Sequence, residues 1–363
     1  MHRPARPSFP ARPVSRRRLL TVGTIGVLTL PVALTGCGPI RLGGPAQYTP
    51  PPPGIDDLYR SDLLTLLARA EAGQGRAAQA ADAGDTASPA LTVALADLAE
   101  TLPVQRTALL TGAQHEREQE AASDPAMPTS PPPPDAPEDA AGLVAVLVQL
   151  RETAADAARQ VSGSLARPVV AIAARTAWSV HVLQQAAQAG EVPDLRTSEE
   201  IRPRRQVPAT DPPSIGAETD YRSTLEQTQQ KEWYTGYVHE VLAARTGGNA
   251  REGHLVLRDR HRQRAEILAT FAEEDGAPVV PRQAVYALPD GALEEGPSSR
   301  LPAQLARSLL VDHVALVGAA PFARRPLSIV AAMQEAETLV GRAGQMRPLP
   351  SLEVEDPPPG DGD

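Results

Sequence analysis

Apolar side chains recur every three or four residues along most of this chain, and this spacing limits its fold more than any other feature. The first such stripe consists of Leu63, Leu67 and Ala70, and similar stripes follow up to about residue 344. A period near 3.6 places these side chains on one face of an α-helix. Aromatic residues make up only 3% of the sequence, which disfavours sheets rich in aromatic and β-branched side chains. The sequence therefore predicts an all-α protein.

Proline and glycine divide this helical pattern into eight segments. Each half of the chain contains two helical segments, a long Pro-rich connection, and two further helical segments. The long connections cover residues 123–137 and 277–298. A single long crossover between the second and third helices is the connectivity of ferritin-like bundles, whereas short loops join antiparallel neighbours. We therefore expect two tandem ferritin-like four-helix bundles.

The N-terminus carries an export motif. Ser15-Arg16-Arg17-Arg18-Leu19-Leu20 resembles a twin-arginine export signal, in which Arg16 and Arg17 form the arginine pair. A weakly apolar run from Leu19 to Leu34 follows the pair. This run is shorter than the roughly 20 residues that a permanent membrane helix needs. The sequence therefore predicts a signal peptide over residues 1–36.

The segment Leu34-Thr35-Gly36-Cys37 resembles the lipoprotein box of bacteria. The resemblance implies cleavage between Gly36 and Cys37 and attachment of a diacylglycerol to the Cys37 thiol, which is enough for stable anchoring. Cys37 is the only cysteine, so no disulfide forms within one chain. We expect a lipid-anchored protein on the outer face of the cytoplasmic membrane. The alternative is an uncleaved signal anchor that ends near Cys37.

The charge balance bears on the partners. Residues 1–36 carry six arginines and no acidic residue, so their removal changes the formal net charge from −9 to −15. A chain with this net negative charge binds the phosphates of nucleic acids poorly. The expected partners are the membrane, through lipidated Cys37, and an envelope protein, with no nucleic acid.

A single core seldom grows beyond about 250–300 residues, so a chain of 363 residues is expected to form two folded domains. Together with the N-terminal motifs and the Pro-rich segments, this divides the chain into six parts. The parts are a signal peptide (1–36), a lipidated Cys with a Pro/Gly-rich tether (37–54), a first helical bundle (55–190), a Pro-rich charged linker (191–214), a second ferritin-like bundle (215–344) and a disordered acidic tail (345–363).

The second half resembles a ferritin-like domain of unknown function found in exported proteins and lipoproteins of actinobacteria. The residues that carry the resemblance are Glu232, Tyr234, Tyr237, His261, Arg262, Arg264, Gly276-Ala277-Pro278, Ala284, Tyr286, Leu288, Pro289 and Leu305-Ala306. The resemblance covers about Ala217 to Gly344, and the first half resembles more weakly the region that precedes this domain. It implies a ferritin-like fold in a twin-arginine-exported lipoprotein, and it supplies no activity.

The usual di-iron centre of ferritin-like proteins needs a Glu-x-x-His pair on two of the four helices, because this spacing places both ligands on one inward face. Three residues before His115, His181, His239, His254, His261 and His313 stand Gly112, Trp178, Gly236, Arg251, Arg258 and Leu310. None of these is acidic, so the usual centre is absent from both halves. Phosphate-binding, nucleophile-elbow and His-Glu-x-x-His motifs are also absent from the sequence.

A degenerate metal site is the remaining candidate. Glu232 and His239 are two helical turns apart on one face, while His261 and His313 fall on apolar stripes of neighbouring helices. Converging Glu and His side chains can hold one cation. The alternative is that these four residues are buried polar groups that hydrogen-bond to one another.

The sequence therefore favours a membrane-anchored extracytoplasmic lipoprotein that is a non-catalytic binding or scaffold protein of the cell envelope, with no cofactor. The alternative is a metal-binding protein or metal-dependent oxidase, with one metal ion in a degenerate ferritin-like site of the second bundle.

Overall fold

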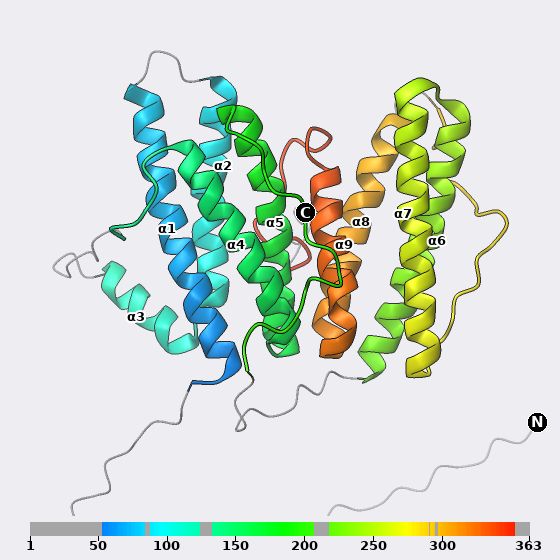
Figure 1. Cartoon of the computed structure of the whole chain (residues 1–363), viewed down its shortest axis with the longest axis horizontal. Coiled ribbons are helices and arrows are strands. Elements are labelled where there is room, and N and C mark those ends of the chain that lie inside the picture. Colours follow the sequence, from blue (N-terminus) through cyan, green and yellow to red (C-terminus); the bar gives the residue numbers. More distant parts are fainter. Residues whose placement is uncertain are drawn as a thin grey trace, which may run out of the picture. The chain divides into compact units, whose positions relative to one another are not determined.

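A computed structural model describes residues 53–83, 88–123, 133–206, 218–289, 291–294 and 297–352. The predicted signal peptide, Cys37 and most of the predicted tether lie outside these residues. The described part contains nine α-helices, one short 3-10 helix and no strand, which confirms the predicted all-α class (Figure 1). Among the described residues, no helix combines the length and the apolar character needed to cross a membrane.

Four helices form the first set: α1 (Ile55–Ala83), α2 (Pro89–Leu109), α4 (Ala140–Gln160) and α5 (Gly163–Ala187). Helix α1 packs on α2 and α4, and α5 packs on the same two helices. Tyr59 near the start of α1 donates a hydrogen bond of 2.6 Å to Gln160 at the end of α4. Helix α1 therefore runs antiparallel to α4 as well as to α2. It follows that α2 and α4 are parallel, which is why a long crossover joins them (Figure 1).

The second set has the same connectivity, and its helices are α6 (Glu218–Arg245), α7 (Gly248–Asp275), α8 (Pro297–Ala319) and α9 (Arg325–Thr338), the last preceded by the 3-10 helix η1 (Phe322–Arg324). The Tyr221 hydroxyl donates to Asp275 at 2.7 Å, so the start of α6 meets the end of α7. Lys231 of α6 contacts Ser308 of α8 at 3.0 Å, and Gln227 contacts Asp312. Helices α7 and α8 are therefore both antiparallel to α6 and parallel to each other.

Local sequence signals set several helix ends. The Ser88 hydroxyl accepts a hydrogen bond of 3.1 Å from the Leu91 N–H, and Pro89 is the first residue of α2. A capping hydroxyl followed by proline favours the start of a helix. Gly276 directly follows the last residue of α7, and its φ of 64° lies in the left-handed region that glycine enters without strain.

One helix was not expected from the sequence. Helix α3 (Gly112–Ser123) lies in the connection between α2 and α4. It carries polar side chains on most faces, and Glu118 forms an ion pair of 2.5 Å with Arg106 of α2. Its lack of an apolar stripe explains why periodicity did not reveal it.

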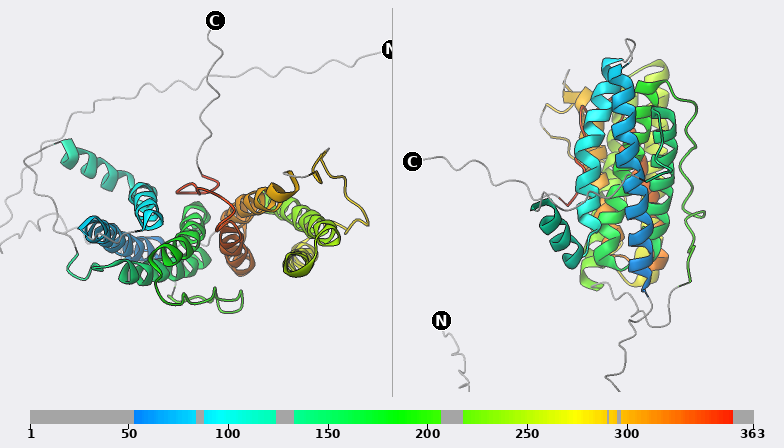
Figure 2. Two further views of the ribbon diagram at one scale, coloured as in Figure 1. Left: turned by 90° about the horizontal axis from the view of Figure 1, so that it is seen from above. Right: turned by 90° about the vertical axis from the view of Figure 1, so that its left-hand side faces the viewer.

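Helix α5 joins the two sets of helices. It packs on α2 and α4 of the first set and on α8 and α9 of the second (Figure 2). Its side chains are buried around the whole helix, including the consecutive residues from Val169 to Val180. The main apolar cluster therefore continues from the first set into α8 and α9. The described residues from 53 to 352 belong to one compact unit, with no boundary at the described part of the predicted linker.

Two close contacts fix this junction. A Cβ added at Gly163, the first residue of α5, would lie 2.5 Å from the carbonyl oxygen of Gly318 in α8. The buried Arg325 guanidinium donates to the carbonyl oxygens of Ala158 (3.1 Å) and Val161 (2.6 Å) at the end of α4. The start of α9 thereby satisfies carbonyl groups that the end of α4 leaves unpaired.

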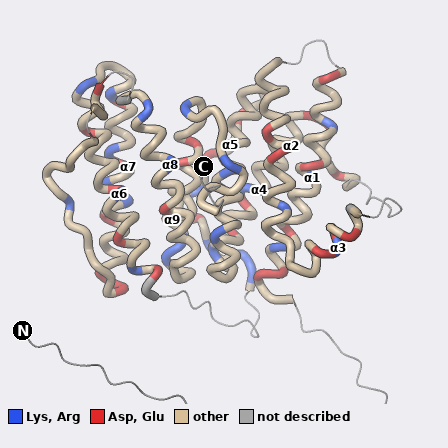
Figure 3. Tube along the Cα trace, turned by 180° about the vertical axis from the view of Figure 1, so that it is seen from behind, with Lys and Arg blue, Asp and Glu red and all other residues tan. Residues whose placement is uncertain are grey.

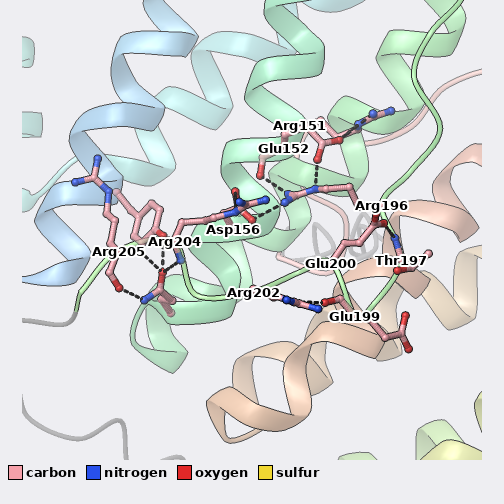
Figure 4. A network of polar contacts seen from close by, with 12 residues as sticks. Arg151, Glu152, Asp156, Arg196, Thr197, Glu199, Glu200, Arg202, Arg204 and Arg205 are labelled. Atoms are coloured by element: carbon pink, nitrogen blue, oxygen red, sulfur yellow. Dashed lines mark hydrogen bonds and ion pairs between the residues drawn. The ribbon is translucent and has the colours of Figure 1, made fainter.

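The predicted linker, 191–214, is packed on the first set over its described part, residues 191–206. Arg196 binds the Asp156 carboxylate at 2.8 Å (Figure 4). The side-chain oxygen of Gln160 accepts hydrogen bonds from the backbone N–H groups of Arg204 and Arg205. Ile201 is only 2% exposed and belongs to the main apolar cluster. This segment is therefore not a free linker, because its charged residues find acidic and amide partners on α4.

The predicted disordered tail, 345–363, also needs correction. Met346 and Leu349 are buried, and Gln105 of α2 donates to the Pro348 carbonyl at 3.1 Å. Arg167 of α5 donates to the Ser351 carbonyl at 2.8 Å. Residues 345–352 are thus part of the packed structure, and residues 353–363 lie outside the described part.

Candidate functional site

The second set of helices contains a buried carboxylate at its centre. Glu232 of α6 is 0% exposed. Its Oε2 accepts a hydrogen bond of 2.7 Å from His261 Nδ1 of α7, and its Oε1 accepts one of 2.7 Å from His313 Nε2 of α8. Three of the four residues named as metal candidates therefore meet in one place.

A buried arginine completes the centre. Arg264 lies three residues after His261, so both side chains leave α7 on the same face. Its Nη1 donates to Glu232 Oε1 at 3.2 Å and to Glu335 Oε1 of α9 at 2.5 Å, and its Nη2 donates to Gln334. Each of the four helices thus contributes a polar side chain, and one guanidinium joins two carboxylates.

The charges of this centre stabilise one another. Burial alone would raise the pKa of Glu232, but the positive charge of Arg264 and the hydrogen bonds from the two histidines hold it well below its usual value. Burial alone would lower the pKa of Arg264, and the carboxylates of Glu232 and Glu335 outweigh that effect and raise it. Glu232 and Arg264 are therefore an ion pair. Acidic and basic residues are interspersed along α6 and α7 (Figure 3).

His239 lies outside this centre. Its Nδ1 is 3.0 Å from His254 Nδ1, and its ring stacks on the His261 ring with 5.5 Å between centroids. Burial and the nearby charges of His261, His254 and Arg342 lower the pKa of His239 to about 3. The ring is therefore neutral at neutral pH. Its neighbours are the rings of His254 and His261, and not the Glu232 carboxylate.

The distances at Glu232 are those of direct hydrogen bonds. Ligand atoms about 2.0–2.1 Å from a tetrahedral metal ion lie roughly 3.3 Å from one another, whereas each Glu232 oxygen lies 2.7 Å from a histidine nitrogen. In the described part of the chain, no group of three or more His, Cys, Asp or Glu side chains is arranged to hold a metal ion. The arrangement is a network in which polar groups satisfy one another.

Three members of this network were absent from the candidates chosen from the sequence, namely Arg264, Gln334 and Glu335. Charged side chains are normally solvated, so their presence on a helix does not indicate a core position. The spacing of His261 and Arg264 was the available signal, because residues three apart share a face.

Aromatic residues hold the crossover between α7 and α8 against α6. The Trp233 indole donates to the Val280 carbonyl at 3.1 Å. Tyr286 packs against Tyr234 and Tyr237, with ring centroids 6.0 and 5.4 Å apart. The residues that carry the family resemblance in this region therefore position the crossover.

Residues 224–354 match the model of a family described as a domain of unknown function (DUF4439). The chain therefore contains this domain, and the match includes the whole Glu232 network and most of the range expected from the resemblance. No curated protein and no solved structure gave a match.

Proposed function

We propose that the protein is a lipoprotein anchored to the outer face of the cytoplasmic membrane, and that its two ferritin-like four-helix bundles act as a non-catalytic binding or scaffold body of the cell envelope. The helix directions support the ferritin-like assignment. In each set, a long crossover joins the parallel second and third helices, as in ferritin-like bundles and unlike simple up-down bundles.

The Arg264 guanidinium is the observation that carries the non-catalytic assignment. In ferritin-like carboxylate proteins, inward side chains from the four helices surround the metal ions. In this chain the corresponding inward groups are Glu232, His261, His313 and Glu335, and a permanent cation already lies between the two carboxylates. A second positive charge at that place would be repelled, which disfavours the metal-dependent oxidase as the alternative function.

Metal analysis of a chain that begins at residue 38 tests this assignment, since it retains the whole compact unit from Pro52. After dialysis against iron, manganese or zinc, we expect the metal content measured by mass spectrometry to equal that of a His261→Ala variant. Stoichiometric metal that disappears in His261→Ala would establish the alternative function and overturn the proposal.

The anchoring part of the proposal is supported by the order of four sequence features. The arginine pair, the apolar run, the lipoprotein box and the only cysteine follow one another within residues 16–37. This order matches an exported lipoprotein precursor.

Replacing Cys37 by serine is therefore expected to abolish lipid attachment and to leave the precursor uncleaved, because serine offers no thiol for the diacylglycerol. Incorporation of labelled palmitate and the mobility of the precursor on a gel measure both effects. Thr24→Ser, an equally small change within the apolar run, should label and mature normally. Continued labelling of Cys37→Ser would show that the lipid is elsewhere.

A further inference from the structure

A cavity of about 700 Å³ lies between α2, α5 and the segment that follows α9. Its walls are mainly apolar and include Val93 and Ala94 of α2, Trp178 and Val182 of α5, and Ala343. Sites for small molecules have volumes of about 300–1,000 Å³ and similarly apolar walls with few polar groups. The cavity is thus large enough for a small organic molecule.

Trp178 supplies an aromatic wall of the cavity. The side chain is 4% exposed, and its indole Nε1, which has no hydrogen-bond acceptor, is buried away from the cavity space. A molecule in the cavity therefore meets the ring of Trp178 and not its N–H.

The wall formed by Trp178 is held in place from behind. The Arg175 guanidinium lies 4.4 Å from the centroid of the Trp178 ring. Arg175 is fully buried and also binds Asp97, Ser179 and Thr101, the last at 2.8 Å. Side chains fixed by such secondary contacts form preorganised binding sites.

The charge of the lining indicates which molecules fit. Asp97 and Glu100 contribute carboxylates, and no lysine or arginine lines the cavity. Asp97 is neutralised by Arg175, whereas Glu100 is exposed and has no ion-pair partner in the described part of the chain. Val93 lies two turns earlier on α2, about 10.5 Å along the helix axis, and is 68% exposed, so the cavity also offers an exposed apolar side chain. Complementary charge therefore favours a cation over an anion.

We propose that this cavity binds a small, largely apolar molecule that carries one cationic group. The cationic group pairs with Glu100, and the apolar body packs against Val93, Val182 and Trp178. This site belongs to the first set of helices and the C-terminal segment. It does not depend on the lipid anchor or on the Glu232 network.

Three dansyl probes that share one fluorophore test the proposal on the chain that begins at residue 38. Dansylcadaverine is cationic, dansylamide is neutral and dansylglycine is anionic. We expect saturable binding of one dansylcadaverine per chain, weaker binding of dansylamide and the weakest binding of dansylglycine. In a Trp233→Phe variant, Trp178 is the only tryptophan, and its emission should transfer to the bound dansyl group.

Variants locate the site. Ala96 is exposed and lines the cavity, so Ala96→Phe should fill the mouth and remove binding of all three probes. Glu100→Gln should weaken dansylcadaverine by about two- to fivefold, as expected for an exposed ion pair, and leave dansylamide unchanged. Glu120→Gln removes an exposed carboxylate of α3 outside the cavity, and should change neither affinity.

Three results would each overturn the proposal. They are the absence of saturable binding, a preference for dansylglycine, and unchanged binding in a folded Ala96→Phe variant with native circular dichroism. None of these results affects the metal content or the lipid labelling, so this proposal and the proposed function fail independently.

Discussion

Replacing Arg264 by methionine is expected to lower the free energy of unfolding by about 3–5 kcal/mol. Methionine retains an apolar stem of similar length but removes the charge that Glu232 and Glu335 share. Their side chains are 0% and 2% exposed, so both carboxylates would remain in the interior without a counter-charge. Urea unfolding followed by circular dichroism at neutral pH measures the change.

Arg262 provides the matched control on the same helix. It forms an ion pair with Glu240, whose side chain is 45% exposed. Because water screens such a pair, Arg262→Met should cost only about 0–1 kcal/mol. Equal costs for the two variants would show that the buried network does not stabilise the fold through its charges.

The helices and their connectivity could be predicted because the signals are local. The apolar stripes, Ser88 with Pro89, and Gly276 each act within one or two turns of chain. The Pro-rich connections 123–137 and 277–298 also mark the crossovers directly in the sequence. Only α3 was missed in this respect, since a short polar helix leaves no periodic pattern.

The shared position of α5 could not be deduced from one stripe. The spacing of Ile172, Thr176, Ser179 and Leu183 predicts a helix with a single inward face. In the structure, the neighbouring residues are buried as well, namely Val169, Val170, Ala173 and Ala174. A helix that is apolar all round is a central helix, and this was the available signal. Its partners α8 and α9 lie more than a hundred residues further along the chain, so no local pattern identifies them.

At the candidate site too, the sequence indicates which side chains are buried but not which of them contact one another. Stripe positions placed His261 and His313 in the interior, where both reach Glu232. His239 shares the face of Glu232, but seven residues separate them by about 10.5 Å along the helix axis. His239 therefore meets His254 of α7 instead. Arg264 is buried together with Glu232 and Glu335, whose carboxylates neutralise its charge, and this grouping depends on the folded arrangement.

Acidification from pH 6.5 to pH 4.5 is expected to lower the free energy of unfolding by about 2–3 kcal/mol through His239 alone. Burial and the charges of His261, His254 and Arg342 lower the pKa of His239 from 6.5 to about 3. Between these values the unfolded ring binds a proton and the folded ring does not. The unfolded state therefore gains about 1.4 kcal/mol per pH unit as the pH falls. The pKa of His254 is also lowered, chiefly by burial, so it adds to the loss in the same direction.

Glu232 does not contribute to the loss of stability between pH 6.5 and pH 4.5. Its pKa is lowered in the folded state, so its contribution to the free energy of unfolding is lost only when the pH falls below 4.5, the ordinary pKa of a glutamate. In His239→Gln, the decline of the free energy of unfolding between pH 6.5 and pH 4.5 should be shallower by about 2–3 kcal/mol in total. Because the slope is compared, a variant that is less stable at every pH remains informative. Parallel profiles for the native chain and His239→Gln would contradict the assignment of a neutral buried ring to His239.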